Sequence, residues 1–356
     1  MANYQSELEE LLEATGKFAA SDIHLSVGRY PTLRIDDRLV PLTKYSVLNA
    51  EHTEKLIEVL LTKEQKDSLF VKKEIDFSYN YKDKLRFRAN VFFQKGSISA
   101  ALRIFPAKIR TIEELNLPSI MKSFVNYSQG FFLVTGPSGH GKTTTLAALI
   151  DLINHTQTKH IITIEDPIEY VFEQDKCIID QREVGNDTLS FRRALRSALR
   201  QDPDIIMVGE MRDLETISIA LTAAETGHLI LASLHTNSSA QSIDRIIDSF
   251  PAGAKNQIKA QLASCLIGIS SQRLIPRING GRIPAVEVMI VNYAIRNLIR
   301  EDKIFQIDLV IETSGDEKMI SLNRSLADLV HRGEINMEDA ETYSLNRADL
   351  KMLLKR

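Results

Sequence analysis

The sequence predicts an α/β protein in which a small α+β domain precedes a larger domain with a parallel sheet. Its 356 residues are enough for two or three domains, each with a core of its own. The first part of the chain mixes amphipathic helices with strands of alternating polarity. Further on, apolar strands alternate with helices, which is typical of a parallel sheet covered on both faces.

In the first domain, Glu7–Phe18 is predicted to form an acidic amphipathic helix with Leu8, Leu11 and Leu12 on one face. Residues 52–70 return to helical spacing. The predicted strands are 21–25, 32–35, 38–40, 75–81, 85–94 and 97–105, with a hairpin turn at 36–37. We place this domain at 1–106.

A linker is predicted at 107–118, because Pro106 and Pro118 flank it and set its reach and angle. It includes a short predicted helix at 112–115. The second domain, 119–356, is predicted to have strands at 131–134, 160–164, 205–208 and 229–234, helices at 142–155, 189–200, 214–225 and 240–249, and a mostly helical end with one strand at 285–290.

The first apolar strand of the second domain, Phe131–Val134, leads into a glycine-rich loop and a helix. Gly136–Thr143 fits G-x-x-x-x-G-K-S/T in the strand–loop–helix context that this phosphate-binding motif requires. Loop N–H groups and the helix N-terminus would hold a polyanionic phosphate, Lys142 would reach the β- and γ-phosphates, and the Thr143 hydroxyl would ligate Mg²⁺. The predicted nucleotide contacts are Gly136, Pro137, Ser138, Gly139, His140, Gly141, Lys142, Thr143 and Thr144.

Three of the other predicted strands end in polar side chains. Glu165, Glu210 and His235 follow the apolar runs directly, and in an open α/β sheet ligands bind outside the carboxyl ends of the strands. Gly209 stands where such a strand usually ends in Asp, so Glu210 takes that role. We expect Glu210 to polarise the attacking water, Glu165 to assist the water or the metal, and His235 to sense the γ-phosphate.

Arginines recur near these segments and are candidates for stabilising phosphoryl transfer, a role often filled by an arginine in trans. One set lies in the second domain: Arg192, Arg193, Arg196, Arg200 and Arg212. A second set, Arg86, Arg88 and Arg103, lies on predicted strands of the first domain and would reach a neighbouring subunit. On a helix or strand, the alternative is a solvated or ion-paired arginine.

The bulk composition limits the function classes. Lys and Arg number 44 against 47 Asp and Glu, a net charge of −3 with no basic tract, so the footprint of a nucleic-acid binder is missing. The two cysteines, Cys177 and Cys265, belong to no C-x-x-C, which excludes a Cys₄ zinc site and suits a reducing compartment. No apolar run is long enough to span a bilayer, and we expect a cytoplasmic protein.

Several longer segments resemble those of the secretion-superfamily ATPases. TIEDPIEYVF (163–172) resembles their aspartate box, residues 181–213 resemble the segment with the Walker B strand, and GHLILASLHTNSSAQSIDRIID (227–248) resembles their histidine box. ASDIHLSVGRYPTLRIDDRL (20–39) and EIDFSY (74–79) are similar to their N-terminal domain. AIRNLIRE (294–301) resembles the C-terminal motif of type IV pilus retraction ATPases.

The resemblance implies a PAS-like N-terminal domain followed by a RecA-like P-loop ATPase domain with a helical C-terminal part. It also implies Mg²⁺-dependent ATP hydrolysis by a homohexameric ring that drives pilus retraction. The ring would dock on an inner-membrane platform protein and would work with other pilus ATPases, peripheral to the membrane and without direct nucleic-acid binding. By this resemblance, Arg88 and Arg103 would act as arginine fingers that reach the site of a neighbouring subunit. Glu165, Glu210, His228 and His235 would be site residues. The metal would be bound by Thr143, Glu165 and Glu210.

Some residues depart from the family's pattern. Ser138, His140 and Thr143 replace common Thr, Ser and Ser residues of the loop, Tyr293 replaces part of a pair before AIRNLIRE, and Asp302 replaces a Gly after it.

Within the superfamily, an accessory retraction ATPase or a pilus-assembly or type II secretion ATPase are alternatives, although the assembly type is longer and carries paired C-x-x-C ligands. Outside it, a RecA-like nucleic-acid motor and a non-hydrolysing nucleotide-gated scaffold stay open.

Overall fold

The structure, a computed structural model, describes residues 2–35, 38–82, 85–105 and 108–355. The chain divides into two compact units, 1–108 with 167–170, and 109–166 with 171–356. Both combine helices with sheets, so the predicted α/β class is confirmed. The predicted turn at 36–37 lies outside the described residues. So do residues 106–107, where the predicted first domain meets its linker. From residue 109 onward, the linker segment belongs to the second unit.

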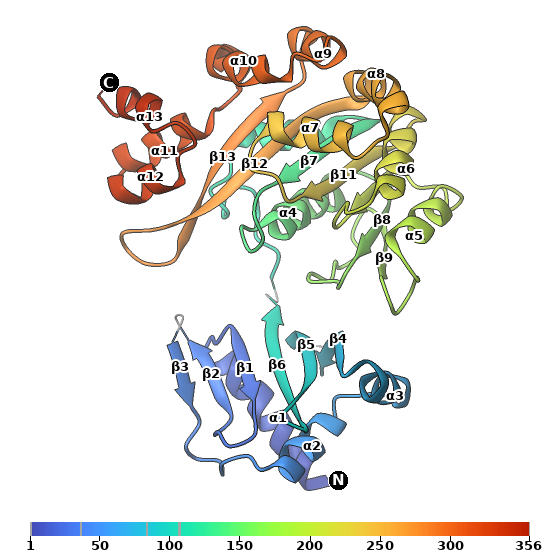
Figure 1. Cartoon of the computed structure of the whole chain (residues 1–356), viewed down its shortest axis with the longest axis vertical. Helices are drawn as coiled ribbons and strands as arrows, with labels where there is room; N and C mark the ends of the chain where they lie inside the picture. The colour runs from blue at the N-terminus through green and yellow to red at the C-terminus, as the bar shows by residue number, and fades with distance from the viewer. Residues whose placement is uncertain (1, 36–37, 83–84, 106–107, 356) are drawn as a thin grey trace. The chain divides into compact units, whose positions relative to one another are not determined.

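The first unit is built on a six-stranded antiparallel sheet with the order β3-β2-β1-β6-β5-β4 (Figure 1). Its strands are β1 (Asp22–Leu25), β2 (Thr32–Ile35), β3 (Arg38–Pro41), β4 (Glu74–Tyr81), β5 (Leu85–Gln94) and β6 (Ser97–Phe105). Helix α1 (Ala2–Lys17) packs its leucine face, Leu8, Leu11 and Leu12, against the inward residues of the sheet, as the sequence predicts.

The predicted helix at 52–70 is two helices, α2 (Ala50–Glu58) and α3 (Lys63–Lys72). The break falls at Thr62, whose side chain accepts a hydrogen bond from the Gln65 backbone while the Gln65 side chain accepts one from the Thr62 N–H. This capping box satisfies two N–H groups at a helix start, so it favours a new helix over the continuation of the old one.

The second unit is built on a seven-stranded sheet with the order β13-β12-β7-β11-β10-β8-β9. All neighbouring strands are parallel except β13, which runs antiparallel to β12. The strands are β7 (Gly130–Thr135), β8 (His160–Glu165), β9 (Ile178–Glu183), β10 (Ile205–Val208), β11 (Leu229–Leu234), β12 (Leu266–Pro276) and β13 (Arg282–Ile290).

Helices cover both faces of this sheet (Figure 1). The helices of the described part of this unit are α4 (Lys142–Thr156), α5 (Phe191–Ala198), α6 (Leu214–Glu225), α7 (Ser239–Asp248), α8 (Lys255–Cys265), α9 (Tyr293–Arg300), α10 (Ile307–Thr313), α11 (Leu322–His331), α12 (Met337–Tyr343) and α13 (Arg347–Leu353), with the 3₁₀ turns η1 (Ser119–Asn126), η2 (Ala252–Ala254), η3 (Ile304–Gln306) and η4 (Gly315–Glu317). Among the described helices, none has both the length and the apolar character needed to cross a membrane.

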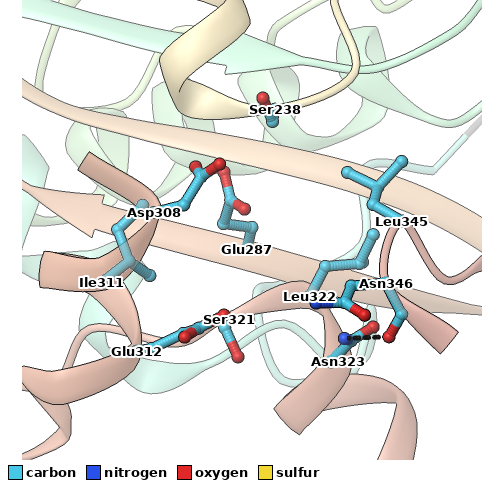
Figure 2. A pocket seen from close by; sticks show the side chains of 10 residues that line it. All are labelled: Ser238, Glu287, Asp308, Ile311, Glu312, Ser321, Leu322, Asn323, Leu345 and Asn346. Carbon is cyan, nitrogen blue, oxygen red and sulfur yellow. Dashed lines mark hydrogen bonds between the residues drawn. The ribbon is translucent and has the colours of Figure 1, made fainter. Parts of the chain in front are cut away.

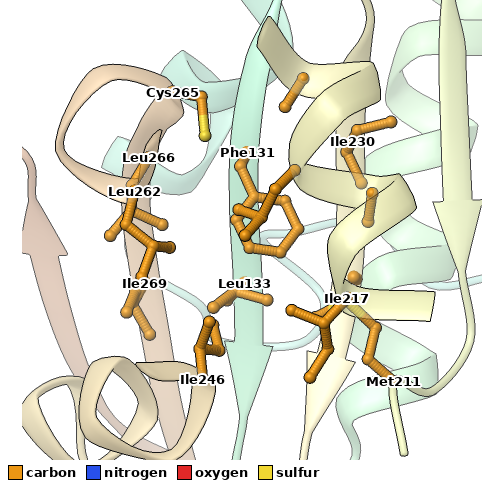
Figure 3. Packing of buried hydrophobic residues seen from close by; sticks show 14 of the residues in the cluster. Phe131, Leu133, Met211, Ile217, Ile230, Ile246, Leu262, Cys265, Leu266 and Ile269 are labelled. Atoms are coloured by element: carbon orange, nitrogen blue, oxygen red, sulfur yellow. The ribbon is translucent and has the colours of Figure 1, made fainter. Parts of the chain in front are cut away.

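Alternate residues of β7 face opposite layers. Phe131 and Leu133 belong to the large core that residues of α5 to α9 cover (Figure 3). On the other face, Phe132 stacks on Phe124 of η1 with ring centroids 4.2 Å apart, and α4 packs beside it. The strand that leads into the phosphate loop is therefore buried from both sides, and the loop starts from a fixed point.

Strands β9 and β12 were missed in the sequence, and 112–115 is a turn instead of the predicted helix. β9 lies at the sheet edge and is largely polar. β12 has the polar run Ser270–Arg273 at its centre, which breaks the apolar pattern that marks a buried strand. These polar residues are nevertheless buried, because they serve the loops of the site described below.

Gly268 lies where β12 passes close to the Phe124 ring. A Cβ there would lie 2.3 Å from Phe124 Cε1 and 2.9 Å from the Met289 carbonyl oxygen. We expect Gly268→Ala to destabilise the second unit by about 1–3 kcal/mol, because the ring or the backbone must shift. Thermal unfolding measures this, with Gly253→Ala as control, since a Cβ at Gly253 meets nothing within 4 Å. Equal melting temperatures for the two variants would contradict the packing described here.

Candidate nucleotide-binding and hydrolysis site

The glycine-rich loop between β7 and α4 is shaped by close packing against β12. Gly136 has a φ of +147°, and a Cβ there would lie 2.4 Å from the Gln272 carbonyl oxygen, so no other residue fits. Gly141, with a φ of +80°, is the N-cap of α4, and no side chain caps this helix. A helix start that follows a glycine-rich loop and has no side-chain cap is the arrangement that binds phosphate.

Lys142 is the first residue of α4 and is buried. Its ammonium donates to the carbonyl oxygens of Gly136 (3.0 Å) and Pro137 (2.9 Å) and lies 3.3 Å from His235 Nδ1. The charge is thereby held inside the curve of the loop. Within the loop, Ser138 and Gly139 are exposed, while Thr143 and Thr144 are half-buried at the start of α4.

The structure brings His235 and Glu210 together, as predicted from the ends of their strands. His235, after β11, lies 3.1 Å from Glu210 Oε1 through its Nε2, and its Nδ1 faces Lys142. Glu210, after β10, is also held by Arg212 through two contacts of 2.7 Å, one to each carboxylate oxygen. A chain of polar contacts therefore runs from Lys142 through His235 and Glu210 to Arg212.

The charge state of Glu210 follows from these polar contacts. Burial by itself would raise the pKa of Glu210, but the hydrogen bond from Arg212 and the proximity of His235 outweigh it and lower the pKa. Glu210 is therefore an anion at neutral pH. An ionised carboxylate near the phosphate loop can orient a water molecule or approach a cation.

Glu165 is the last residue of β8 and is almost fully buried. Its Oε1 accepts hydrogen bonds from Thr163 Oγ1 (2.6 Å) and Gln181 Nε2 (3.2 Å). At Gly209 the strands β8 and β10 come close, since its N–H donates to the Ile164 carbonyl and a Cβ there would lie 3.2 Å from that oxygen. The backbones of β8 and β10 thus approach closely, which places both acids at the same edge of the sheet.

Residues of β12 complete the site, and the sequence interpretation missed them. Gln272 donates to the His140 carbonyl (2.6 Å) and accepts from Thr145 Oγ1 (2.9 Å), while the Leu274 N–H donates to His140 Nδ1 (2.9 Å). His140, which departs from the family's pattern, therefore links the phosphate loop to β12 through two hydrogen bonds. The polar run within an apolar stretch was the available signal for these contacts.

A small cavity of about 130 Å³ adjoins the phosphate loop. Gly141, Thr144 and Thr145 are among its lining residues, and so are Arg110 and Arg282. Both arginines are free of ion pairs among the described residues. Since the cavity continues from the first turn of α4, it offers space for the part of a nucleotide beyond its phosphates.

Three of the predicted site residues are not brought to this loop within the second unit. His228 precedes β11, so it lies at the opposite end of that strand from His235, about 20 Å away for six residues. Arg88 and Arg103 lie in the first unit, directly opposite one another on β5 and β6. Arg103 Nε contacts Asp22 at 2.8 Å, and Arg88 Nε lies 3.5 Å from Asp76.

The donors at this edge suit Mg²⁺. The described residues contain no cluster of three or more His, Cys, Asp or Glu side chains arranged around one point. Mg²⁺ in nucleotide sites does not need such a cluster, because it takes one or two protein oxygens together with phosphates and water. The Thr143 hydroxyl and the ionised Glu210 are oxygen donors of this kind, and Glu165 is a third.

The loop, the strand-end acids and the parallel sheet together define a P-loop nucleotide hydrolase. Residues 7–280 match the family described as type II/IV secretion system protein, and the chain belongs to that family.

Over 335 residues the chain is 47% identical to the type IV pilus retraction ATPase PilT of Pseudomonas aeruginosa, which covers 94% of this chain and 97% of that one. It is 37% identical to the type IV pilus ATPase PilU of the same organism over 98% of this chain and 91% of that one. The crystal structure of the pilus retraction motor PilT with bound ADP is similar with a TM-score of 0.91, at 46% identity and coverage of 97% and 98%. The resemblance to retraction ATPases is therefore confirmed, and the chain is an ATPase.

His140 gives this loop a pH dependence. Burial, aided by Arg273, Arg282 and Lys142, lowers the pKa of His140 below 6.5, and the neutral ring accepts the Leu274 N–H. The unfolded chain binds this proton more tightly than the folded protein does. The contribution of His140 to the free energy of unfolding is therefore fully present above pH 6.5, and it is lost as the pH falls through the lowered pKa of the folded state. We expect His140→Asn, whose oxygen can replace Nδ1 as acceptor but does not titrate, to lose less stability between pH 7.5 and 5. Thermal unfolding across this pH range measures the difference, and parallel pH profiles would contradict it.

Proposed function

We propose that this protein is the Mg²⁺-dependent ATPase of a homohexameric motor that powers type IV pilus retraction. It would act in the cytoplasm, docked on an inner-membrane platform protein and so peripheral to the membrane, without binding nucleic acid directly. The proposal rests mainly on the contacts of His235 with Lys142 and Glu210, which connect the phosphate loop to the predicted water-orienting acid. Similarity to PilT over nearly the whole of both chains supports the retraction role.

In the proposed reaction, the N–H groups from Gly136 to Thr144 bind the phosphates of ATP. Lys142, which donates to Gly136 and Pro137, transfers these hydrogen bonds to the β- and γ-phosphates. The cavity beside Thr144 takes the nucleoside. Thr143, Glu165 and Glu210 would hold Mg²⁺, which neutralises phosphate charge when bound.

Hydrolysis in this proposal is controlled by His235. Glu210 orients the attacking water by accepting its hydrogen bond, while Arg212 and His235 fix the carboxylate. Because His235 lies between Lys142 and Glu210, it transmits the position of the lysine to the acid. The γ-phosphate would change that position, so the histidine reports whether triphosphate is bound.

Arg88 and Arg103 are proposed to complete the pocket of a neighbouring subunit. Both are partly or largely exposed on the first unit, on the same face of its sheet. His228, distant from the loop of its own chain, is proposed to act at such a boundary as well. Closure and release of the first unit about the linker 107–118 would then convert hydrolysis into rotation between the units.

An accessory retraction motor is the nearest alternative, since PilU is also similar over nearly the whole chain. The higher identity to PilT, 47% against 37%, favours the principal motor. Deleting the gene discriminates between these roles, because loss of the principal motor leaves cells with more pili that no longer shorten. Retraction that persists in the deletion strain would exclude the principal role.

Replacing Glu210 separates binding from hydrolysis. We expect Glu210→Gln to lower kcat about 10²–10⁴-fold, because the amide attracts the water's proton far less than the carboxylate does. Nucleotide affinity should stay within about twofold, since the phosphates are bound by backbone and Lys142. Phosphate release and binding of a fluorescent ATP analogue measure the two. The control is Glu225→Gln at the far end of the sheet, and a Glu210 variant as active as this control would refute the assignment.

Mixing two inactive variants tests whether the pocket is shared between subunits. Lys142→Gln disables the loop, and we expect Arg103→Gln to lower kcat about 10³-fold or more. If the arginine acts in trans, an equal mixture of the two restores about a quarter of the boundaries, because each complete pocket needs one subunit of each kind. Wild type mixed equally with the double variant is the control, with the same expected fraction. A mixture no more active than its components, beside an active control, would show that Arg103 acts within its own chain.

A further inference from the structure

The hairpin of β12 and β13 carries two buried charged residues that the proposed reaction does not use. Arg273 on β12 is 6% exposed and Glu287 on β13 is 7% exposed. Among the described residues, no ion pair within 4.0 Å joins them. Burying an ionisable side chain without polar partners is unfavourable, so both residues are expected to have polar partners nearby.

Both residues bind the short segment that follows His235. Arg273 Nη2 donates to the backbone oxygen of Asn237 (3.0 Å) and to its side-chain Oδ1 (2.9 Å). Glu287 Oε1 accepts the N–H of Ser239 at 2.7 Å. Ser239 is the first residue of α7, so Glu287 satisfies an N–H group that has no partner within the helix.

The segment forms one block, because hydrogen bonds link its own residues to one another and to the first turn of α7. Thr236 Oγ1 lies 2.6 Å from Ser242 Oγ, which in turn donates to the Ser238 carbonyl at 2.6 Å. The Ser238 hydroxyl accepts the Gln241 N–H and caps α7. Two attachment points on such a block fix its position and its orientation, and His235 is the residue immediately before it.

We propose that Arg273 and Glu287 are positioning residues for hydrolysis: through the segment 236–239 they hold His235 in register with Lys142 and Glu210. This inference rests on the proposed function, in which His235 relays the state of the phosphate loop. Gln272 lies beside Arg273 on β12 and binds the His140 carbonyl of the loop and the Thr145 hydroxyl in the first turn of α4. One hairpin therefore holds both the loop and the segment after the relay histidine.

The surroundings of Glu287 set the design of the variants. A cavity of about 220 Å³ opens beside it, and Asp308 and Glu312 of α10 line the same cavity (Figure 2). Burial, with a contribution from Asp308, raises the pKa of Glu287. Glutamine keeps an oxygen for the Ser239 N–H, whereas methionine has a similar shape and no acceptor. Glu287→Gln and Glu287→Met thus form a pair that differs in this one hydrogen bond.

The experiment measures kcat, KM and nucleotide affinity of the assembled full-length ATPase. We expect Glu287→Met to lower kcat about ten- to a hundredfold with nucleotide affinity within about twofold, because a small misplacement of a catalytic relay has effects of this size. Glu287→Gln should retain most of the activity. Arg273→Met should resemble Glu287→Met, and it serves as the second variant where Glu287→Met does not fold.

Lys259→Met is the matched control for a merely structural role. Lys259 is also a buried charge, 8% exposed and paired with Asp302 at 3.2 Å, but it lies on α8 away from the segment. Its loss should lower the melting temperature without changing kcat of the folded protein. A Glu287→Met variant that behaves in the same way, with wild-type kcat, would overturn the inference.

A double-variant cycle assigns the effect to His235. If Glu287 acts through the histidine, Glu287→Met should lower kcat no further in a His235→Ala background. Additive losses would show that Glu287 acts by another route and would overturn the inference. The proposed function fails separately: wild-type protein that does not hydrolyse ATP, or a fully active His235→Ala variant, would refute it whatever the Glu287 variants do.

Discussion

The contact between Lys142 and His235 is the interaction on which the arrangement of the site depends. Lys142 begins α4, after the loop that follows β7, and His235 follows β11; these two strands are neighbours in the sheet. A buried ammonium needs polar partners, and two loop carbonyls and an imidazole nitrogen of His235 are among them here. This requirement brings the histidine to the loop, and its second nitrogen then reaches Glu210.

The parallel strands and the convergence of Glu165, Glu210 and His235 could be predicted from the sequence. Apolar runs identify strands that are buried on both faces, and parallel strands place their carboxyl ends at one edge. The phosphate loop has a motif of its own. In each case the information is local, because it lies within one strand and the few residues that follow it.

The contributions of β12 and β13 could not be predicted in this way. Gln272, Arg273 and Glu287 are polar residues in buried strands, and they make sense only beside loops that lie far away in the sequence. Periodicity does not reveal such partners. The same limit applies to His228, Arg88 and Arg103, which the family resemblance proposes for the site but which the fold of the second unit does not bring to the loop.

For the proposed role of Arg103 at the pocket of a neighbouring subunit, its pairing with Asp22 has a consequence for the entropy of phosphate binding. Asp22 is buried, accepts a hydrogen bond from the Ser21 hydroxyl and contacts the Nε of Arg103, whose side chain is 69% exposed. The carboxylate restricts the swing of the guanidinium, and the two terminal amino groups make no further hydrogen bond among the described residues. An arginine tethered at its inner nitrogen gives up less rotational entropy on capture and keeps the planar fork that recognises phosphate.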